Sequence, residues 1–367
     1  MHINKSIIVS AVVAALVSAC IPVAFGQNNK GSQGPDRNAS RKKMLERFDK
    51  DGDGKLSPEE RQTMMQAQRQ QSQGRSDNQQ RPDDYYKKYQ TRIEKHIYKK
   101  APQGDLAIYI HFPKDWTTRD KRPAIVFFFG GGWNNGTVEQ FSGQAHYFAS
   151  RGMVTARADY RVNSRHKTTP DKCVEDGKSA IRWLRERAAQ FGIDPDKIVS
   201  SGGSAGGHIA ACTWTTTGLE AEGENTTIST RPNLLVLYNP VLRCTDEQIA
   251  QRMGSEQMAE RLSPNLNLSK ATPPAIAFYG TKDKFSAQGE EFLQLSQKFG
   301  NTVELYFAQD QPHGFFNRSP WHQQTTILVD QFLTKHGYLT GKPTLKPPEG
   351  SIALKKISAG KKQKLEK

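Results

Sequence analysis

A glycine-rich turn around Ser204 restricts the fold more than any other stretch of this sequence. An apolar segment leads into the turn over residues 201–207, and a second apolar segment follows it. This order predicts a strand, a tight turn and a helix. Gly202 and Gly206 lie two residues to either side of Ser204, where small residues allow the strand and the helix to approach closely. We therefore expect the Ser204 hydroxyl to project from the edge of a sheet, beside the Ala205 N–H.

Other apolar segments are typical of the strands and helices of one large domain. Two alternating segments near its start predict antiparallel strands, whereas continuous apolar runs predict strands buried on both faces, as in a parallel sheet. Residues 171–190 have the spacing of an amphipathic helix, and residues 246–270 predict a helical excursion that is a candidate lid. We therefore predict an α/β domain over residues 84–340, with a mostly parallel central sheet and helices on both faces. The predicted strands cover residues 93–98, 105–113, 123–129, 153–160, 196–200, 234–238, 274–280 and 303–308.

Two polar residues follow predicted strands at positions that suit catalysis. Asp283 comes just after the strand 274–280, and His313 comes just after the strand 303–308. Because the carboxyl ends of parallel strands meet at one edge of a sheet, we expect both residues near Ser204. A serine hydroxyl becomes a strong nucleophile when an imidazole takes its proton, and a carboxylate orients that imidazole. The histidines that lack such a placement in this order are His146, His166, His208 and His322.

Three consecutive glycines predict a site that binds negative charge. Gly130–Gly132 follow the predicted strand 123–129, where successive N–H groups can turn toward one point. The alternative is a flexible loop without a catalytic role. The position of the glycines relative to the turn at Ser204 favours the anion-binding interpretation.

Together these motifs make the sequence resemble the α/β-hydrolase superfamily over about residues 90–338. More narrowly, it looks like the esterase branch that contains acetyl xylan esterases and bifunctional feruloyl/acetyl esterases. The resemblance implies a triad of Ser204, Asp283 and His313, with the N–H groups of Gly131, Gly132 and Ala205 as oxyanion donors. Family members usually carry a histidine where this chain has Phe129, which leaves open how the glycine loop is braced. The motifs that carry the resemblance are Gly130–Trp133, Ala180–Arg185, Gly192–Ile198, Ser204–His208, Asn239–Leu242 and Pro312–Phe315.

A separate motif near the N-terminus predicts a calcium site. Residues 49–60 match the twelve-residue EF-hand loop, including the glycine at its sixth position. Both flanking segments have helical spacing, so we predict an EF-hand element over residues 38–65. The alternative is an acidic turn without an ion. Because the sequence contains one such loop, we expect a structural or docking element instead of a calcium sensor. The predicted ligands are Asp49, Asp51, Asp53, Lys55 through its backbone carbonyl, and Glu60.

The remaining segments predict export and flexible regions. Residues 1–26 combine a positive charge, an apolar run and small residues before the predicted cleavage site, as in a secretory signal peptide. The alternative is a lipoprotein anchored through Cys20. Residues 66–83 are rich in glutamine and arginine, which predicts a flexible linker. Residues 341–367 are rich in lysine and proline and predict a disordered tail.

Charge and cysteine content restrict the partners. The formal net charge of the 367-residue chain is +15, and many lysines lie in the tail. A solvated tail is the favoured interpretation, and contact with an anionic polymer or surface is the alternative. Nucleic-acid binding is not expected of an exported protein without a basic, aromatic reading face. Without Cys20 three cysteines remain, which permit at most one disulfide.

We therefore predict a secreted or periplasmic serine esterase that needs no cofactor for catalysis. It is expected to remove acetyl or feruloyl groups from a small-molecule or polysaccharide ester, through an acyl-enzyme. The alternatives are a lipase or short-chain carboxylesterase, a prolyl-oligopeptidase-like peptidase, and a non-catalytic calcium-binding scaffold. The acyl group, the alcohol and the oligomeric state are open at this point.

Overall fold

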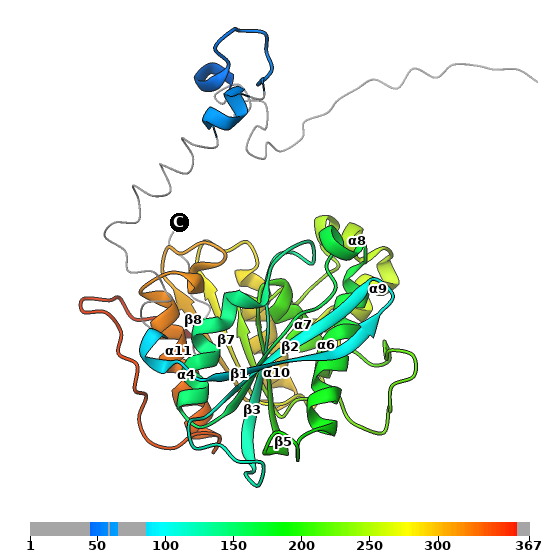
Figure 1. The fold of residues 1–367 in the computed structure, drawn as a ribbon, viewed down its shortest axis with the longest axis vertical. Coiled ribbons are helices and arrows are strands. Elements are labelled where there is room, and N and C mark those ends of the chain that lie inside the picture. Colours follow the sequence, from blue (N-terminus) through cyan, green and yellow to red (C-terminus); the bar gives the residue numbers. More distant parts are fainter. Residues whose placement is uncertain (1–44, 58, 65–85, 358–367) are drawn as a thin grey trace, which may run out of the picture. The chain divides into compact units, whose positions relative to one another are not determined.

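A computed structural model describes residues 45–57, 59–64 and 86–357 (Figure 1). The chain divides into two compact units, residues 1–74 and residues 75–367. In the smaller unit, helical residues 45–48 and 59–64 flank the acidic loop, as the EF-hand motif predicts. The predicted signal peptide and linker lie outside the described residues.

Within residues 86–357, the larger unit is built on one nine-stranded sheet with the strand order β1-β2-β4-β3-β5-β6-β7-β8-β9. The strands from β4 to β8 in this order pair in parallel, whereas β1, β2 and β9 run antiparallel to their neighbours. The predicted class, a mostly parallel α/β sheet, is confirmed. The strands are β1 (Arg92–Ala101), β2 (Gly104–Phe112), β3 (Arg122–Phe128), β4 (Val154–Ala158), β5 (Ile193–Gly203), β6 (Leu234–Tyr238), β7 (Ala275–Gly280), β8 (Val303–Ala308) and β9 (Lys355–Ile357).

Continuous apolar strands separate two hydrophobic cores, one on each face of the sheet. Successive side chains of a strand point to opposite faces. On β3, Val126 and Phe128 therefore belong to one core, whereas Ile125 and Phe127 belong to the other. All four side chains are fully buried. This explains why these strands lack the alternation of apolar and polar residues that a half-exposed strand shows.

Helices cover both faces (Figure 1). Helices α6, α7 and α10 contribute side chains to the first core, and α4 and α11 contribute to the second. The predicted helix at 171–190 is α6, which begins with Pro170 in its first turn, where a missing N–H costs no hydrogen bond. The helices are α4 (Ser142–Ser150), α5 (Asn163–His166), α6 (Pro170–Glu186), α7 (Ala205–Thr215), α8 (Glu247–Met253), α9 (Glu256–Arg261), α10 (Ser286–Lys298) and α11 (Trp321–Lys335), with 3₁₀ turns at Lys87–Tyr89, Val138–Phe141, Pro264–Leu266 and Phe315–Asn317.

The segment between β6 and β7 is the helical excursion that the sequence predicts. It carries α8, α9 and the 3₁₀ turn Pro264–Leu266. Met253 and Ala259 are buried and pack into the core beneath α6 and α7. The excursion is therefore anchored to the domain by its apolar side.

The prediction of a disordered tail is wrong for residues 341–357. Leu345 and Leu354 are buried, and β9 pairs with β8. Lys335 and Lys356 each place Nζ 2.7 Å from the Glu304 carboxylate on β8. The lysine-rich composition suggested solvation, whereas Lys356 pairs with Glu304 and the leucines supply the packing. Residues 358–367 lie outside the described residues.

Cys173, Cys212 and Cys244 are buried free thiols. Among the described residues, no helix combines the length and the apolar character that crossing a membrane requires.

Candidate active site

Ser204 lies at the sharp turn between β5 and α7, in a backbone conformation that side chains rarely adopt. Its φ is 54° and its ψ is −117°. The flanking glycines are required sterically: a β-carbon on Gly202 would lie 2.3 Å from the carbonyl oxygen of Gly206. One on Gly206 would lie 2.1 Å from the carbonyl oxygen of Phe128. The strained turn is thus enforced by close approach of strand and helix, as the sequence predicts.

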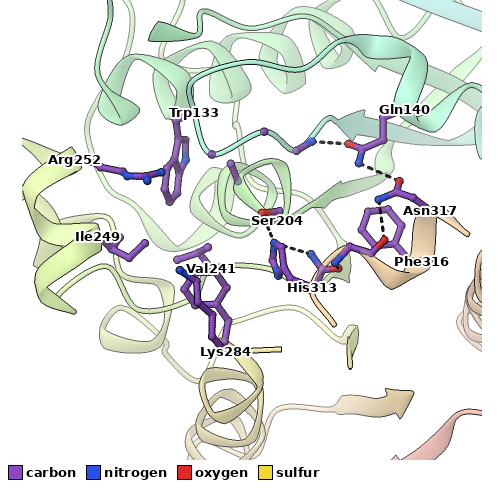
Figure 2. A pocket seen from close by; sticks show the side chains of 17 residues that line it. Trp133, Gln140, Ser204, Val241, Ile249, Arg252, Lys284, His313, Phe316 and Asn317 are labelled. Carbon is purple, nitrogen blue, oxygen red and sulfur yellow. Dashed lines mark hydrogen bonds between the residues drawn. The ribbon is translucent and has the colours of Figure 1, made fainter. Parts of the chain in front are cut away.

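The three residues predicted to form a triad lie together in one hydrogen-bonded row. Ser204 Oγ is 2.7 Å from His313 Nε2, and His313 Nδ1 is 2.8 Å from Asp283 Oδ2 (Figure 2). The Asp283 side chain is fully buried, while 32% of the His313 side chain is exposed. The other Asp283 oxygen accepts the Phe285 N–H at 2.9 Å, which fixes the carboxylate. A carboxylate that accepts the proton of Nδ1 leaves Nε2 free to accept the serine proton.

Asn239 also contacts this row, and sequence reasoning assigned it no role beyond its place in a family motif. It follows β6 and is fully buried. Its Oδ1 accepts the Gly314 N–H at 3.1 Å, and its Nδ2 lies 3.4 Å from His313 Nε2. Asn239 therefore holds the loop that carries the histidine.

The three predicted oxyanion donors line the same cavity as Ser204 and His313, whose volume is about 380 Å³. Within the described part of the chain, the N–H groups of Gly131 and Gly132 donate no hydrogen bond. Ala205 is the first residue of α7, where backbone N–H groups have no acceptor within the helix. These three groups are thus available to a ligand.

Gly130, by contrast, is part of the brace of the loop. Its N–H donates to Gln140 Oε1 at 2.6 Å, and Gln140 Nε2 donates to Asn317 Oδ1 at 3.1 Å. Asn317 Nδ2 in turn donates to the Gly314 carbonyl oxygen at 3.1 Å. Figure 2 shows this chain of bonds from the glycine loop to the loop of His313.

The residue at the usual histidine position is held by an aromatic partner. The rings of Phe129 and Tyr160 stack with centroids 4.1 Å apart, and the Tyr160 hydroxyl donates to the Phe129 carbonyl oxygen at 2.7 Å. The glycine loop is therefore held in place by Tyr160, Gln140 and Asn317. None of them could be identified from the sequence, because no periodicity or motif marks them.

Comparison with known proteins agrees with this geometry. The BD-FAE family model matches residues 108–236. The structure of the apo form of Thermogutta terrifontis esterase 2 is 45% identical, has a TM-score of 0.66, and covers 68% of this chain and 97% of its own. A second structure of that esterase, phosphorylated by paraoxon, is 46% identical, with a TM-score of 0.65 and coverage of 68% and 96%. The chain belongs to the α/β-hydrolase family of serine esterases.

A plant relative of this carboxylic ester hydrolase is more distant. The probable isoprenylcysteine alpha-carbonyl methylesterase ICMEL1 of Arabidopsis thaliana is 26% identical over 242 residues, which cover 59% of this chain. The chain spans 50% of the length of that relative.

His208 of the esterase has a structural role in the pocket wall. The Trp133 indole N–H donates to its Nδ1 at 3.2 Å, and its Nε2 lies 2.7 Å from the Leu262 carbonyl oxygen. Burial lowers the pKa of His208 to about 4, so the ring is neutral at pH 7 and donates through Nε2. It therefore holds Trp133, which lines the cavity, and lies outside the reacting row.

Three of the predicted calcium ligands lie close together, whereas Glu60 lies apart from them. One oxygen from each of Asp49, Asp51 and Asp53 lies within 4.8 Å of the others, which suits a hard cation with oxygen ligands. The Asp53 N–H acts to lower the pKa of Asp51, but contact with Asp49 and neighbouring carboxylates outweighs it and raises that pKa. Glu60 is outside this cluster: its oxygens accept the N–H groups of Lys50 and Ser57, at 2.6 and 2.9 Å.

Proposed function

We propose that this chain is a secreted serine esterase that removes acetyl or feruloyl groups from a carbohydrate, with Ser204, His313 and Asp283 as its triad. The observation that carries the proposal is the hydrogen-bonded row, in which Ser204 Oγ is 2.7 Å from His313 Nε2. The family membership and the BD-FAE match support ester hydrolysis. The leader at residues 1–26 supports export. N-terminal sequencing of the exported protein tests that part.

Acylation begins when Ser204 Oγ attacks the ester carbonyl carbon and its proton passes to His313 Nε2. Asp283 stabilises the imidazolium that forms. The carbonyl oxygen becomes an oxyanion, which accepts hydrogen bonds from the N–H groups of Gly131, Gly132 and Ala205. Collapse of the tetrahedral intermediate breaks the ester C–O bond, and the alcohol leaves with the proton from His313. The acyl group is then bonded to Ser204 Oγ.

Deacylation repeats these steps with water. His313 Nε2 takes a proton from the water as its oxygen attacks the acyl carbon. The second intermediate collapses with Ser204 as the leaving group, and His313 returns the proton to Oγ. The products are the free acid and the regenerated enzyme. Loss of one oxyanion donor typically lowers kcat roughly 10²–10³-fold, which is less than the loss that follows removal of a triad serine or histidine.

The size of the reaction cavity supports a compact acyl group. The reaction cavity has a volume of about 380 Å³ and is lined by both apolar and polar side chains. Phe316 and Val241 offer apolar contacts, while Asn317 and Gln140 are bonded to each other at its rim.

The test is hydrolysis of p-nitrophenyl acetate, p-nitrophenyl laurate and acetylated xylan by the wild type and by Ser204→Ala. We expect release of acetate from the first and third substrates and loss of that activity in the variant. A preference for the laurate ester would favour the lipase alternative. A folded wild type that hydrolyses none of the three would reject the esterase and leave the peptidase or the non-catalytic scaffold.

We also propose that the loop 49–60 binds Ca²⁺. The gathered carboxylates of Asp49, Asp51 and Asp53 support this, and the glycines at positions 52 and 54 have the positive φ angles that the turn needs, +72° and +78°. Glu60 would exchange its backbone partners for the ion. No catalytic step depends on this ion.

A further inference from the structure

Arg252 lies at the boundary between two cavities. It projects from α8 and lines both the reaction cavity and a second cavity of about 600 Å³. Gly131, Gly132 and Trp133 line both as well, so the glycine loop and Arg252 form the common wall. A second group on a substrate bound at Ser204 can therefore reach the other cavity past this arginine.

The guanidinium group lies close to the glycine loop. A β-carbon added to Gly132 would be 3.2 Å from Arg252 Nη1. Figure 2 shows the side chain extending from α8 toward Trp133. The planar guanidinium presents its N–H groups in a fork that matches a carboxylate in two parallel hydrogen bonds.

The charge of Arg252 has no counter-ion in the described part of the chain. Arg161, Arg182 and Arg243 of the same domain each form an ion pair with a carboxylate. No such pair and no hydrogen bond is made by Arg252 within residues 86–357, and none of the residues that line either cavity is acidic. Lys284 adds a second positive charge to the reaction cavity. The combined surface is therefore complementary to an anion.

The rest of the second cavity is polar and mostly uncharged, which suits hydroxyl groups. Its wall includes Asn134, Asn163, Thr168 and Thr169. Thr168 is only 8% exposed, and its Oγ1 has no hydrogen-bond partner among the described residues. The Thr168 hydroxyl is covered, so the polar groups that the wall offers to a ligand are those of Asn134 and Asn163, which are exposed. The Thr169 hydroxyl is already bonded to Asp171, which is not part of the wall.

We propose that Arg252 and the second cavity bind the alcohol part of an ester that carries a carboxylate, as in an acetylated acidic carbohydrate. This inference rests on the proposed esterase function and specifies its substrate class. The carboxylate pairs with the Arg252 guanidinium, and neighbouring hydroxyls bond to the asparagine side chains of the wall. The charged group belongs to the alcohol because an acetyl group has no position for it.

The experiment compares two acetate esters of the same shape, 4-acetoxybenzoate and its uncharged amide, 4-acetoxybenzamide. The measured quantity is the ratio of their kcat/KM values for the wild type, Arg252→Gln and Arg252→Lys. Lys298→Gln is the matched control, because it removes one exposed positive charge from α10, which supplies no part of the wall. A third ester, mono-4-nitrophenyl glutarate, carries its carboxylate on the acyl side.

We expect the ratio of charged to neutral ester to fall about tenfold in Arg252→Gln, to fall less in Arg252→Lys, and to stay at the wild-type value in Lys298→Gln. An unchanged ratio in Arg252→Gln would overturn the anion site while leaving the esterase intact. If Arg252→Gln lowers kcat/KM only for the glutarate ester, the assignment of Arg252 to the alcohol side is overturned. A wild type that hydrolyses neither acetate ester would instead reject the esterase function itself.

Discussion

At the scale of single residues, the reacting atoms are held by neighbours that take no part in bond making. Asp283 is fixed by a backbone N–H, His313 is flanked by Asn239, and Gly130 is tied to Gln140. Each bond restricts the motion of a reacting group before the substrate binds. The entropy cost of ordering that group is therefore not part of the activation barrier. Positioning residues of this kind act through kcat more than through KM, because they set the geometry of the reacting groups.

Replacing Gln140 by alanine should lower kcat for p-nitrophenyl acetate by about tenfold with little change in KM. The amide is the one link, through Asn317, between the N–H of Gly130 and the loop of His313 that the described residues show. Without this amide the glycine loop is no longer held in position relative to Ser204. Steady-state kinetics measure the split between kcat and KM.

Gln297→Ala, on the exposed surface of α10, is the control for loss of a glutamine amide and should leave both constants at the wild-type values. Gln140→Glu retains the acceptor for the Gly130 N–H but not the donor to Asn317, so it should recover part of the rate. Equal kinetics for wild type and Gln140→Ala would show that the bonded chain has no positioning role.

At the scale of elements, the last strand is attached to the sheet by charge as well as by packing. Burial acts to raise the pKa of Glu304, but hydrogen bonds from Lys335 and Lys356 outweigh it and lower that pKa to about 2. A carboxyl group whose pKa is lower in the folded state stabilises the fold above its ordinary pKa, here 4.5. This contribution is lost as the pH falls from about 4.5 toward 2.

Glu304→Gln should therefore destabilise the protein at pH 7, by roughly 1–2 kcal/mol given the exposed lysines, and by much less near pH 2.5. Denaturant unfolding at the two pH values measures the difference. Glu290→Gln, at an exposed position of α10, should show no such pH dependence. A penalty for Glu304→Gln that is the same at both pH values would contradict the ion-pair account of β9.

The same element marks the limit of prediction from sequence. Strands β3 and β7 could be predicted because continuous apolar runs mark them, and with them the positions of Ser204, Asp283 and His313. β9 has three residues, two of them lysines, so neither periodicity nor composition indicates a strand. Its pairing depends on β8 and Glu304, which are remote in sequence. The brace of the glycine loop escaped prediction for the same reason, because it consists of contacts between distant side chains.

At the scale of the whole molecule, the reacting row and the predicted calcium loop belong to separate units. The reacting row lies within residues 75–367, whereas the acidic loop lies within residues 1–74. A lone EF-hand loop of an extracellular module binds calcium weakly, with Kd on the order of 10⁻⁴–10⁻³ M. If the loop binds calcium as proposed, the ion should affect the stability of the small unit without entering the catalytic cycle.

Titration of the full chain with Ca²⁺ by isothermal calorimetry should reveal one weak site, absent from Asp53→Ala. A chelator should change kcat for p-nitrophenyl acetate by less than about twofold, because the proposed acylation and deacylation steps use no metal ion. Asp105→Ala, at an exposed position of the larger unit, should retain the site. Identical titrations for the wild type and Asp53→Ala would exclude calcium from the loop.

The excursion between β6 and β7 has a consequence for engineering. It supplies Ile249 and Arg252 to the cavity wall, yet none of the three residues in the reacting row. Its position on the domain is set by buried apolar side chains such as those of Met253 and Ala259. A library that keeps those anchors and varies the exposed residues of α8 and α9 would explore new selectivities on an unaltered reaction centre. Selectivity and turnover are thus separable by exchange of residues 246–270, which leaves Asn239 in place.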